Sequence, residues 1–267
     1  MNEPNNPYQA PEANLVVEQP AGDWALIEPR RVPVSHGWKW IADAFRLFAK
    51  SPGIWIVNLL IFMVLMMALS VIPFLGWLAI IPVVVMTGGL MAGAYQLDRD
   101  ISPLKIDHLF IGFRDKLWKL AAVGGLYLLA SVVISFAVFI PVGVGVGFMA
   151  ATDPNMHESA VLMPMIIAFV ILFVLFIPVM MAYWFAPALV MLHDDVDAIR
   201  AMKLSLVGCL RNILPLIVYG IILSVFMVIA MIPVFLGLLV MWPVMMASMY
   251  TAYRDIFVAR ETHETQI

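Results

Sequence analysis

The side chains that could carry chemistry lie in loops or at the ends of long apolar segments. Five histidines are scattered over the chain: His36, His108, His157, His193 and His263. The acids Asp194 and Asp195 follow His193 and could bind a cation with it, but neighbouring residues of a helix point in different directions. The single cysteine, Cys209, excludes an intrachain disulfide and a cysteine-based zinc cluster. We therefore predict no metal site and no cofactor.

Familiar catalytic signatures are missing from the sequence. There is no Gly-Lys-Ser phosphate loop, no His-Glu-x-x-His and no Gly-x-Ser-x-Gly. No charged residue or histidine lies well inside an apolar segment, where it would mark a proton or ion path. Polar residues within these segments, such as Asn58, Thr87 and Ser248, are expected to form hydrogen bonds between helices. We predict that the chain is neither an enzyme nor a proton-coupled pump.

The composition indicates which kind of structure must position these residues. Of 267 residues, 63% are hydrophobic and only 12% are charged, and the mean hydropathy is +0.97. A soluble domain is about half apolar and about one quarter charged. We therefore predict an all-α polytopic membrane protein. The net charge of −3 and the lack of a basic patch argue against nucleic acid as a partner.

Six apolar segments are long enough to cross a membrane as helices. They lie at about 54–72, 74–95, 118–150, 164–193, 213–232 and 234–253. An amphipathic segment with aromatic and basic residues precedes each pair and is suited to the membrane interface. These interfacial helices are expected at about 36–50, 106–119 and 197–211.

A short proline string occurs once in each pair of predicted spans. It reads Ile-Pro-Val-Val-Val-Met at Pro82, Ile-Pro-Val-Met-Met-Ala at Pro178 and Trp-Pro-Val-Met-Met-Ala at Pro243. Hairpin turns are expected at Pro73, Pro141 and Pro233. An acidic residue follows each string: Asp98, Asp194 and Asp255. The matches predict one helical hairpin used three times, in repeats at about 36–100, 106–195 and 196–257.

Each repeated proline removes a backbone donor and frees the carbonyl group one turn earlier. We interpret Pro82, Pro178 and Pro243 as structural kinks that improve helix packing. In the alternative interpretation, the three kinks meet at one level and present their carbonyl groups to a central cavity. Gly89 and Gly93 form a small-x-x-x-small pair in the second span and are expected to let helices approach closely.

The third and fourth spans are longer than a bilayer requires. They lie in apolar runs of about 33 residues, at 118–150 and 160–192, each of which would extend about 50 Å, against about 30 Å for the hydrocarbon core. Either the middle hairpin tilts and projects outward, which we favour, or it folds back at 143–147, where Gly143, Gly145 and Gly147 alternate with valine. A re-entrant segment would imply a channel or a substrate path.

The positions of the fifteen Lys and Arg residues predict the topology. They lie in the N-terminal region, the second and fourth loops and the C-terminal tail, and the other three connections have none. By the positive-inside rule, both termini are then cytoplasmic. Residues 1–34, rich in proline and polar residues, are expected to form a disordered cytoplasmic tail. The membrane domain is expected at 35–257, with a second cytoplasmic tail at 258–267.

Three segments carry a resemblance to a known family: Asn6-Pro7-Tyr8-Gln9-Ala10-Pro11, the run Ala-Ile-Arg-Ala-Met-Lys-Leu-Ser-Leu at 198–206, and Tyr253-Arg254-Asp255-Ile256-Phe257. In these segments the chain resembles an uncharacterised family of bacterial inner-membrane proteins. Its plan of an amphipathic helix plus a hairpin is also similar to the membrane domains attached to some glycerophosphodiesterases. The resemblance implies a bacterial cytoplasmic membrane and supplies no catalytic residues, because no phosphodiesterase domain is present.

Three function classes follow from these features. We expect a membrane scaffold or accessory protein, because nothing in the spans indicates coupling to ions. One alternative is a facilitator or channel for a small or lipidic solute. Another is a lipid-organising protein that holds anionic lipids with its basic interfacial helices. The expected partners are membrane lipids and other membrane proteins.

Overall fold

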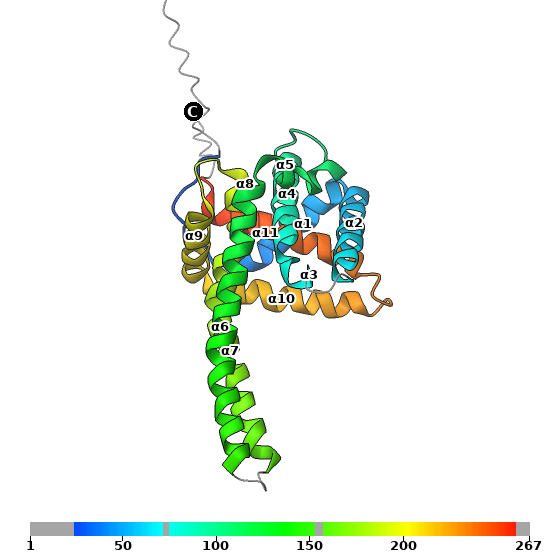
Figure 1. Cartoon of the computed structure of the whole chain (residues 1–267). Coiled ribbons are helices and arrows are strands. Elements are labelled where there is room, and N and C mark those ends of the chain that lie inside the picture. Colours follow the sequence, from blue (N-terminus) through cyan, green and yellow to red (C-terminus); the bar gives the residue numbers. More distant parts are fainter. Residues whose placement is uncertain (1–23, 72–74, 153–156, 260–267) are drawn as a thin grey trace, which may run out of the picture.

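The computed structural model describes residues 24–71, 75–152 and 157–259, and the regular elements in this part of the chain are helices (Figure 1). An isolated β-bridge joins Leu26 to Val258. The predicted all-α class is thus confirmed. The segments 1–23, 72–74, 153–156 and 260–267 lie outside the described residues, and the turn predicted at Pro73 is among them.

The helices follow one another in three groups. The first is α1 (His36–Lys50), α2 (Pro52–Ser70), α3 (Leu75–Leu78) and α4 (Ile80–Asp98). The second is the 3-10 helix η1 (Ile106–Leu109), α5 (Ile111–Asp115), α6 (Leu117–Thr152), α7 (Glu158–Trp184) and α8 (Ala186–Leu192). The third is α9 (Ala198–Arg211), α10 (Ile213–Met231) and α11 (Leu238–Phe257). The interfacial helix predicted at 106–119 is therefore divided between η1, α5 and the start of α6.

Five segments of the described chain are long and apolar enough to cross a membrane: Pro52–Ser70, Ile80–Asp98, Leu117–Thr152, Ala160–Leu192 and Ile213–Met231. The sixth predicted span, 234–253, is not among them. Val234 and Phe235 have positive φ angles of 51° and 64°, so the chain turns tightly before α11 begins at Leu238. The shortened helix then includes Arg254 and Asp255, which lower its mean hydropathy.

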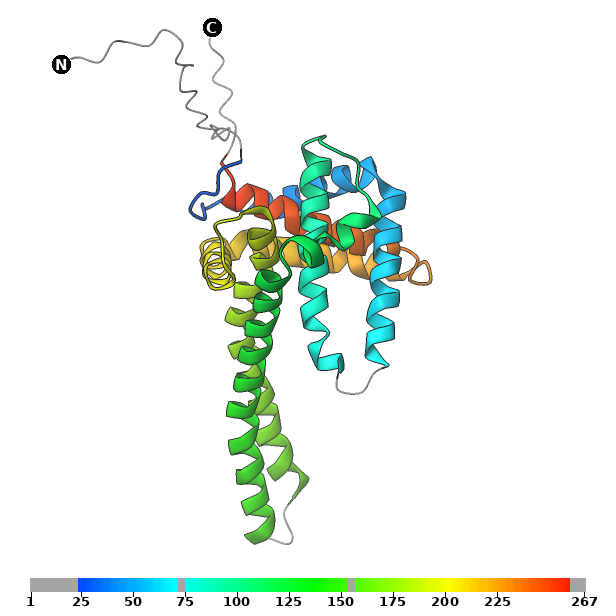
Figure 2. The same ribbon diagram turned by 45° about the horizontal axis from the view of Figure 1, so that its top comes forward.

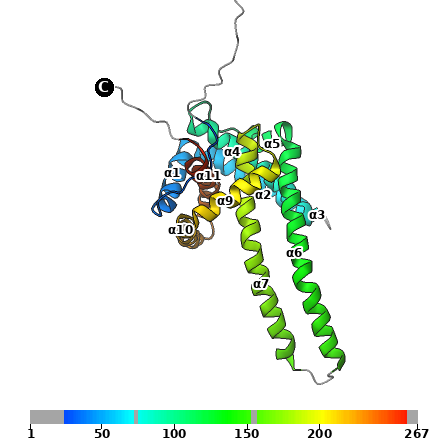
Figure 3. The ribbon, with the colours of Figure 1, turned by 90° about the vertical axis from the view of Figure 1, so that its left-hand side faces the viewer.

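Helices α6 and α7 pack side by side and extend away from the other helices (Figure 3); we call this pair the arm. With 36 residues in α6, the arm reaches about 54 Å at about 1.5 Å per residue. The re-entrant alternative is wrong, because 143–147 is helical throughout. The turn predicted at Pro141 is also wrong. Losing one hydrogen bond does not end a helix that packs along a partner, and the ring of Phe139 lies 5.5 Å from that of Phe169 in α7.

The other helices form a compact group that we call the head. Helix α11 packs against α1, α2, α4 and α10, and α4 packs against α6 and α8. Helix α10 lies across the direction of the arm: Figure 1 shows it along its length and Figure 3 shows it end-on. It therefore cannot run along the membrane normal while the arm does.

The prediction of a structureless tail over 1–34 is wrong for residues 24–34. Ile27 N donates to Phe257 O at 2.9 Å, and Arg30 N donates to Ile256 O at 3.1 Å. In the opposite direction, Ala259 N donates to Ala25 O at 3.2 Å. Figure 2 shows this first described segment, in blue, beside the end of α11, in red. These backbone bonds fix the segment to the head, which the proline-rich composition did not indicate.

Candidate functional site

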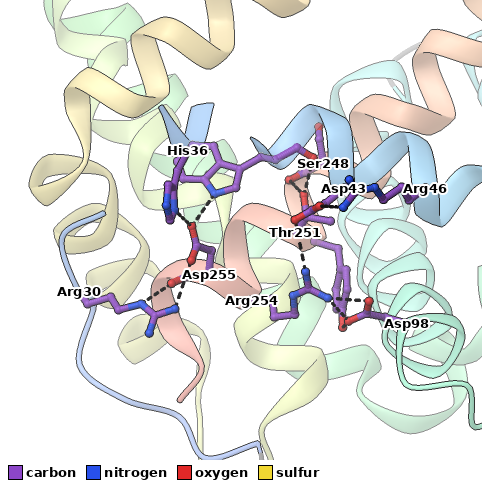
Figure 4. Close-up of polar contacts among 11 residues, drawn as sticks. Arg30, His36, Asp43, Arg46, Asp98, Ser248, Thr251, Arg254 and Asp255 are labelled. Atoms are coloured by element: carbon purple, nitrogen blue, oxygen red, sulfur yellow. Dashed lines mark hydrogen bonds and ion pairs between the residues drawn. The ribbon is translucent and has the colours of Figure 1, made fainter. Parts of the chain in front are cut away.

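A group of charged residues joins the N-terminal segment, α1, α4 and the end of α11 (Figure 4). We call it the polar clamp. Its members are Arg30, His36, Asp43, Asp98, Arg254 and Asp255. The clamp brings together residues more than 150 positions apart in the chain.

Asp255 accepts hydrogen bonds from partners in the N-terminal part of the chain. Its Oδ2 lies 2.5 Å from His36 Nδ1 and 2.9 Å from Trp40 Nε1, and its Oδ1 lies 3.2 Å from Arg30 Nη2. Burial alone would raise the pKa of this carboxyl group. The hydrogen bonds from Trp40 and His36 and the charges of His36 and Arg30 outweigh burial and lower the pKa below its ordinary value. An ionised carboxylate is thus held where its side chain is only 10% exposed.

Arg254 connects α11 to two other helices. Its Nη1 donates to both carboxylate oxygens of Asp98, at the end of α4, over 2.6 and 2.5 Å. Its Nη2 lies 3.6 Å from Oδ2 of Asp43 in α1. The Tyr250 hydroxyl group also donates to Asp98, at 2.9 Å. Removing the guanidinium group would therefore leave carboxylates on α1 and α4 without this cation.

Asn212, between α9 and α10, extends this connection to the N-terminal segment. Its Oδ1 accepts from Val32 N, and its Nδ2 donates to Arg30 O and Gly208 O, each at 2.9 Å. The side chain is buried, with 1% exposure of the residue. These three bonds are all to backbone groups, so Asn212 holds the segment before α1 in place.

The three acids that follow the proline strings do not share one site. Asp98 and Asp255 belong to the clamp, whereas Asp194 Oδ1 lies 2.7 Å from Lys116 Nζ at the base of the arm. The hydrogen bond from Lys116 and its charge lower the pKa of Asp194. Asp194 is highly exposed, so this pair is a surface contact and contributes little to stability.

The histidines of the described chain do not gather into a metal site. His193 Nε2 lies 2.5 Å from the Tyr253 hydroxyl oxygen, so this ring nitrogen has a protein partner. Across the described ranges, no three His, Cys, Asp or Glu residues lie close enough together to hold a metal ion. Cys209 is buried, and its Sγ contacts Met181 O at 3.5 Å; burial raises the pKa of its thiol to about 12.

A cavity of about 200 Å³ lies between α2, α4, α7 and α11. Its wall is rich in aromatic and sulfur-containing side chains and has no charged residue. The aromatic, aliphatic and sulfur-containing lining residues are Trp55, Leu59, Phe62, Val83, Leu90, Tyr183, Trp184, Trp242, Pro243, Met245, Met246 and Met249, and the amide and aliphatic hydroxyl side chains are Asn58 and Thr87.

The repeated prolines do not meet at this cavity. Pro243 lines it from inside α11, whereas Pro178 lies inside α7 away from its wall. Pro82 is the third residue of α4, where a backbone N–H would have no partner within the helix. Pro82 therefore does not kink the interior of α4, and the alternative of three prolines around one cavity is wrong.

Two buried polar atoms of residues on the cavity wall have no hydrogen-bond partner in the described structure: Trp55 Nε1 and Asn58 Oδ1. Both residues are about 1% exposed. The amide nitrogen of Asn58 does reach Lys105 O, at 3.4 Å. Because buried polar groups are nearly always paired, these two side chains on the cavity wall have unused hydrogen-bonding capacity.

The glycine pair of α4 faces η1 and the segment before it. A Cβ atom at Gly89 would overlap the carbonyl oxygen of His108, and one at Gly93 would lie 2.6 Å from Leu104 Cδ1. The close approach that the sequence predicted is therefore made to a short 3-10 turn and not between two membrane spans.

Comparison with curated proteins finds a relative of similar length. The chain is 29% identical over 206 residues to a probable inner membrane protein of Burkholderia thailandensis, which covers 71% of this chain and 72% of the relative. No protein-family model matches the chain, and no solved structure matches it. The chain is an integral membrane protein. The name of the relative agrees with the five segments of the described chain that are long and apolar enough to cross a membrane.

The sequence did not reveal the clamp or the unpaired wall residues. The sequence pattern indicates only that Asp98 and Asp255 each follow a repeated string, and Arg30 lies in a segment whose composition predicts disorder. One feature of the sequence does predict charged partners: Arg254 and Asp255 directly follow an apolar run, where uncompensated charges are unfavourable. Their partners are too far away in sequence to be found from spacing.

Proposed function

We propose that this chain is a scaffold or accessory protein of the bacterial cytoplasmic membrane, without enzymatic activity of its own. The observation that carries the proposal is the arm. In Leu117–Thr152 and in Ala160–Leu192, the segments that contain α6 and α7, only 6% of the 18-residue apolar stretch is buried within the molecule. An exposed apolar surface of this extent is typical of contact with lipid and with other membrane proteins.

The head supports this function by holding the base of the arm. Helix α6 packs on α4, and α7 packs on α9. The charged pairs of the clamp tie α4 to α1 and α11. A platform fixed in this way would present the arm in a constant direction, as a scaffold requires.

We further propose that the membrane domain, head and arm together, is built from three copies of one unit, a helix or helical turn followed by a hairpin. Each interfacial element packs on the hairpin of a neighbouring unit: η1 and α5 on α4, α9 on α7 and α8, and α1 on α10 and α11. The last pairing returns to the first unit and closes a ring. This cyclic order supports an internal repeat, because unrelated hairpins have no reason to share it.

The proposed topology has both termini in the cytoplasm and three hairpins that enter the membrane from that side, as the distribution of Lys and Arg indicates. A reporter fused after Asp153 should report the outside, and a cytoplasmic signal there would contradict the proposal. If the chain crosses the membrane six times, a reporter fused after Pro233 should also report the outside. A cytoplasmic signal after Pro233 alone would leave the α10–α11 hairpin along the membrane, as the crosswise position of α10 suggests.

Site-specific photo-cross-linking in cells tests the scaffold function. A photoreactive residue would replace Phe136, Val144 or Phe173 in the arm, which are 60%, 68% and 72% exposed. Ile221 on α10 is 60% exposed and serves as the matched control. The proposal expects discrete protein adducts from the arm and lipid adducts from Ile221. Lipid adducts alone at all four positions would contradict it.

A facilitator for a lipidic solute is the second candidate, and the cavity is the observation that favours it. The wall of the cavity is almost entirely apolar and has no charged side chain. Such a wall suits a lipidic solute and not an ion, because an ion would lose its hydration without a compensating partner.

A further inference from the structure

We propose that the cavity between α2, α4, α7 and α11 is a binding site for a small neutral amphiphile that carries a hydroxyl group. The inference rests on the size of the cavity, the absence of charge on its wall and the two unpaired polar atoms of Trp55 and Asn58. It does not depend on the scaffold function of the arm.

The volume limits the size of the ligand. At about 200 Å³, the cavity exceeds the apolar cavity of about 150 Å³ that is known to bind benzene, and it is smaller than the pockets of about 300 Å³ or more that hold drug-sized molecules. A ligand of about eight to ten non-hydrogen atoms fits these limits. A medium-length alkyl chain or a substituted single ring has this size.

The wall determines the charge of the ligand. Its lining residues are aromatic, aliphatic or sulfur-containing apart from Asn58 and Thr87. An ionised ligand would be transferred into this environment without a counter-charge, which is strongly unfavourable. The ligand is therefore neutral, and most of its surface is apolar.

The two unpaired atoms determine its polar group. Trp55 Nε1 can only donate a hydrogen bond, and Asn58 Oδ1 can only accept one. The two residues are three positions apart on α2, which places them on the same face of the helix. A hydroxyl group is the smallest neutral group that accepts from one and donates to the other. Met245 and Met246 also line the cavity, and such flexible side chains can shift to let the hydroxyl group approach.

Binding can be measured with 8-bromo-1-octanol and, as the matched probe without a hydroxyl group, 1-bromooctane. Bromine quenches tryptophan fluorescence at short range, and Trp55, Trp184 and Trp242 lie on the wall. For the purified protein in detergent, we expect saturable quenching with about five-fold tighter binding of the alcohol, the effect of about one net hydrogen bond.

Three variants separate site binding from other causes of quenching. Asn58→Leu should abolish the preference for the alcohol while 1-bromooctane still binds. Leu90→Phe, at a buried position on the wall, should weaken binding of both probes. Ile221→Phe, on the exposed face of α10, should change neither. Thermal unfolding of each variant shows that it is folded, and the Asn58→Leu comparison remains decisive if Leu90→Phe does not fold.

Two results would overturn the proposal. Quenching that rises without saturation and equally in all variants would show that the probes only partition into detergent. An alcohol that binds no better than 1-bromooctane to the unaltered protein would show that Trp55 and Asn58 are satisfied by each other or by their surroundings. Neither result would affect the cross-linking test of the scaffold function.

Discussion

The head and the arm differ in a way that reverses the rule for soluble proteins. Among the five candidate spans, α4 has the lowest mean hydropathy, 1.6, and is the most buried, with 67% of its 18-residue apolar stretch inside the molecule. The segment that contains α7 has the highest, 3.1, and is only 6% buried. In a membrane the solvent is apolar, so the most apolar helix faces lipid, and helices rich in small and polar residues pack inside the protein.

The same contrast appears in the forces that act on each region. The head is stabilised by buried ion pairs such as that of Asp255, by the hydrogen bonds of the buried amide of Asn212, and by close backbone contacts at glycines such as Gly89. In the outer part of the arm, Gly143, Gly145 and Gly147 have open space around them. Matched substitutions in the two regions should therefore have opposite or very different effects on stability.

The largest effect is expected for the buried carboxylate of the clamp. Asp255→Ala leaves Arg30 and His36 without their anion, and we expect the free energy of unfolding to fall by about 3 kcal/mol. Asp195 pairs with Arg200 at 2.8 Å, but its side chain is 66% exposed, so Asp195→Ala should cost no more than about 0.5 kcal/mol. Denaturant unfolding in detergent, followed by circular dichroism, measures both. Equal losses would show that the clamp is not a central support.

The next comparison uses one substitution in both regions. Gly89→Ala forces a methyl group against the backbone of η1 and should cost about 2 kcal/mol by overpacking. The methyl group added by Gly145→Ala would meet no atom within 4 Å. This substitution should therefore stabilise the arm by up to about 1 kcal/mol, because alanine has a higher helix propensity than glycine. Thermal unfolding of the two variants should shift in opposite directions, and a loss at both positions would remove the distinction between head and arm.

A smaller difference is expected between the two buried asparagines. Asn212→Ala leaves Val32 N and Arg30 O without their partner, at a cost of about 1–2 kcal/mol. Asn58→Leu removes an unpaired buried acceptor and loses only the long bond of 3.4 Å to Lys105 O, so it should be close to neutral or stabilising in the absence of ligand. The same unfolding assay tests the pair. A large loss for Asn58→Leu would mean that its amide group already has a full set of partners.

The smallest effect is a dependence on pH that is confined to the head. Burial lowers the pKa of His108, whose Nδ1 accepts from Lys105 N at 2.9 Å and is therefore unprotonated. The pKa of His108 is lower in the folded protein than in the unfolded chain, where it is about 6.5. The neutral ring therefore stabilises the fold fully above about pH 6.5, and this stabilisation is lost as the pH falls below that value. We expect at most about 1.4 kcal/mol of destabilisation at pH 5.5 from this residue. His108→Gln should flatten the pH dependence between pH 7.5 and 5.5.

The sequence predicted most of the helices and missed most of what joins them. Apolar length and amphipathic spacing located α1, α2, α6, α9 and α10 closely, because these patterns are local. Proline was misleading as a turn signal at Pro141, since packing along α7 outweighs one lost hydrogen bond. Local patterns also could not show that Arg30 reaches Asp255 or that Trp55 and Asn58 line a cavity with α7 and α11. Those contacts depend on the relative positions of helices that are distant in sequence.

Hydrogen exchange in lipid nanodiscs tests the central claim, that the clamp holds the head together and the arm is a separate unit. We predict that Asp255→Ala increases amide exchange in residues 24–50 and 238–257, which meet at the clamp, and leaves residues 126–177 of the arm unchanged. The Asp195→Ala control should change neither region. An equal increase in the arm and the head after Asp255→Ala would contradict the account, because it would show that the molecule unfolds as one unit.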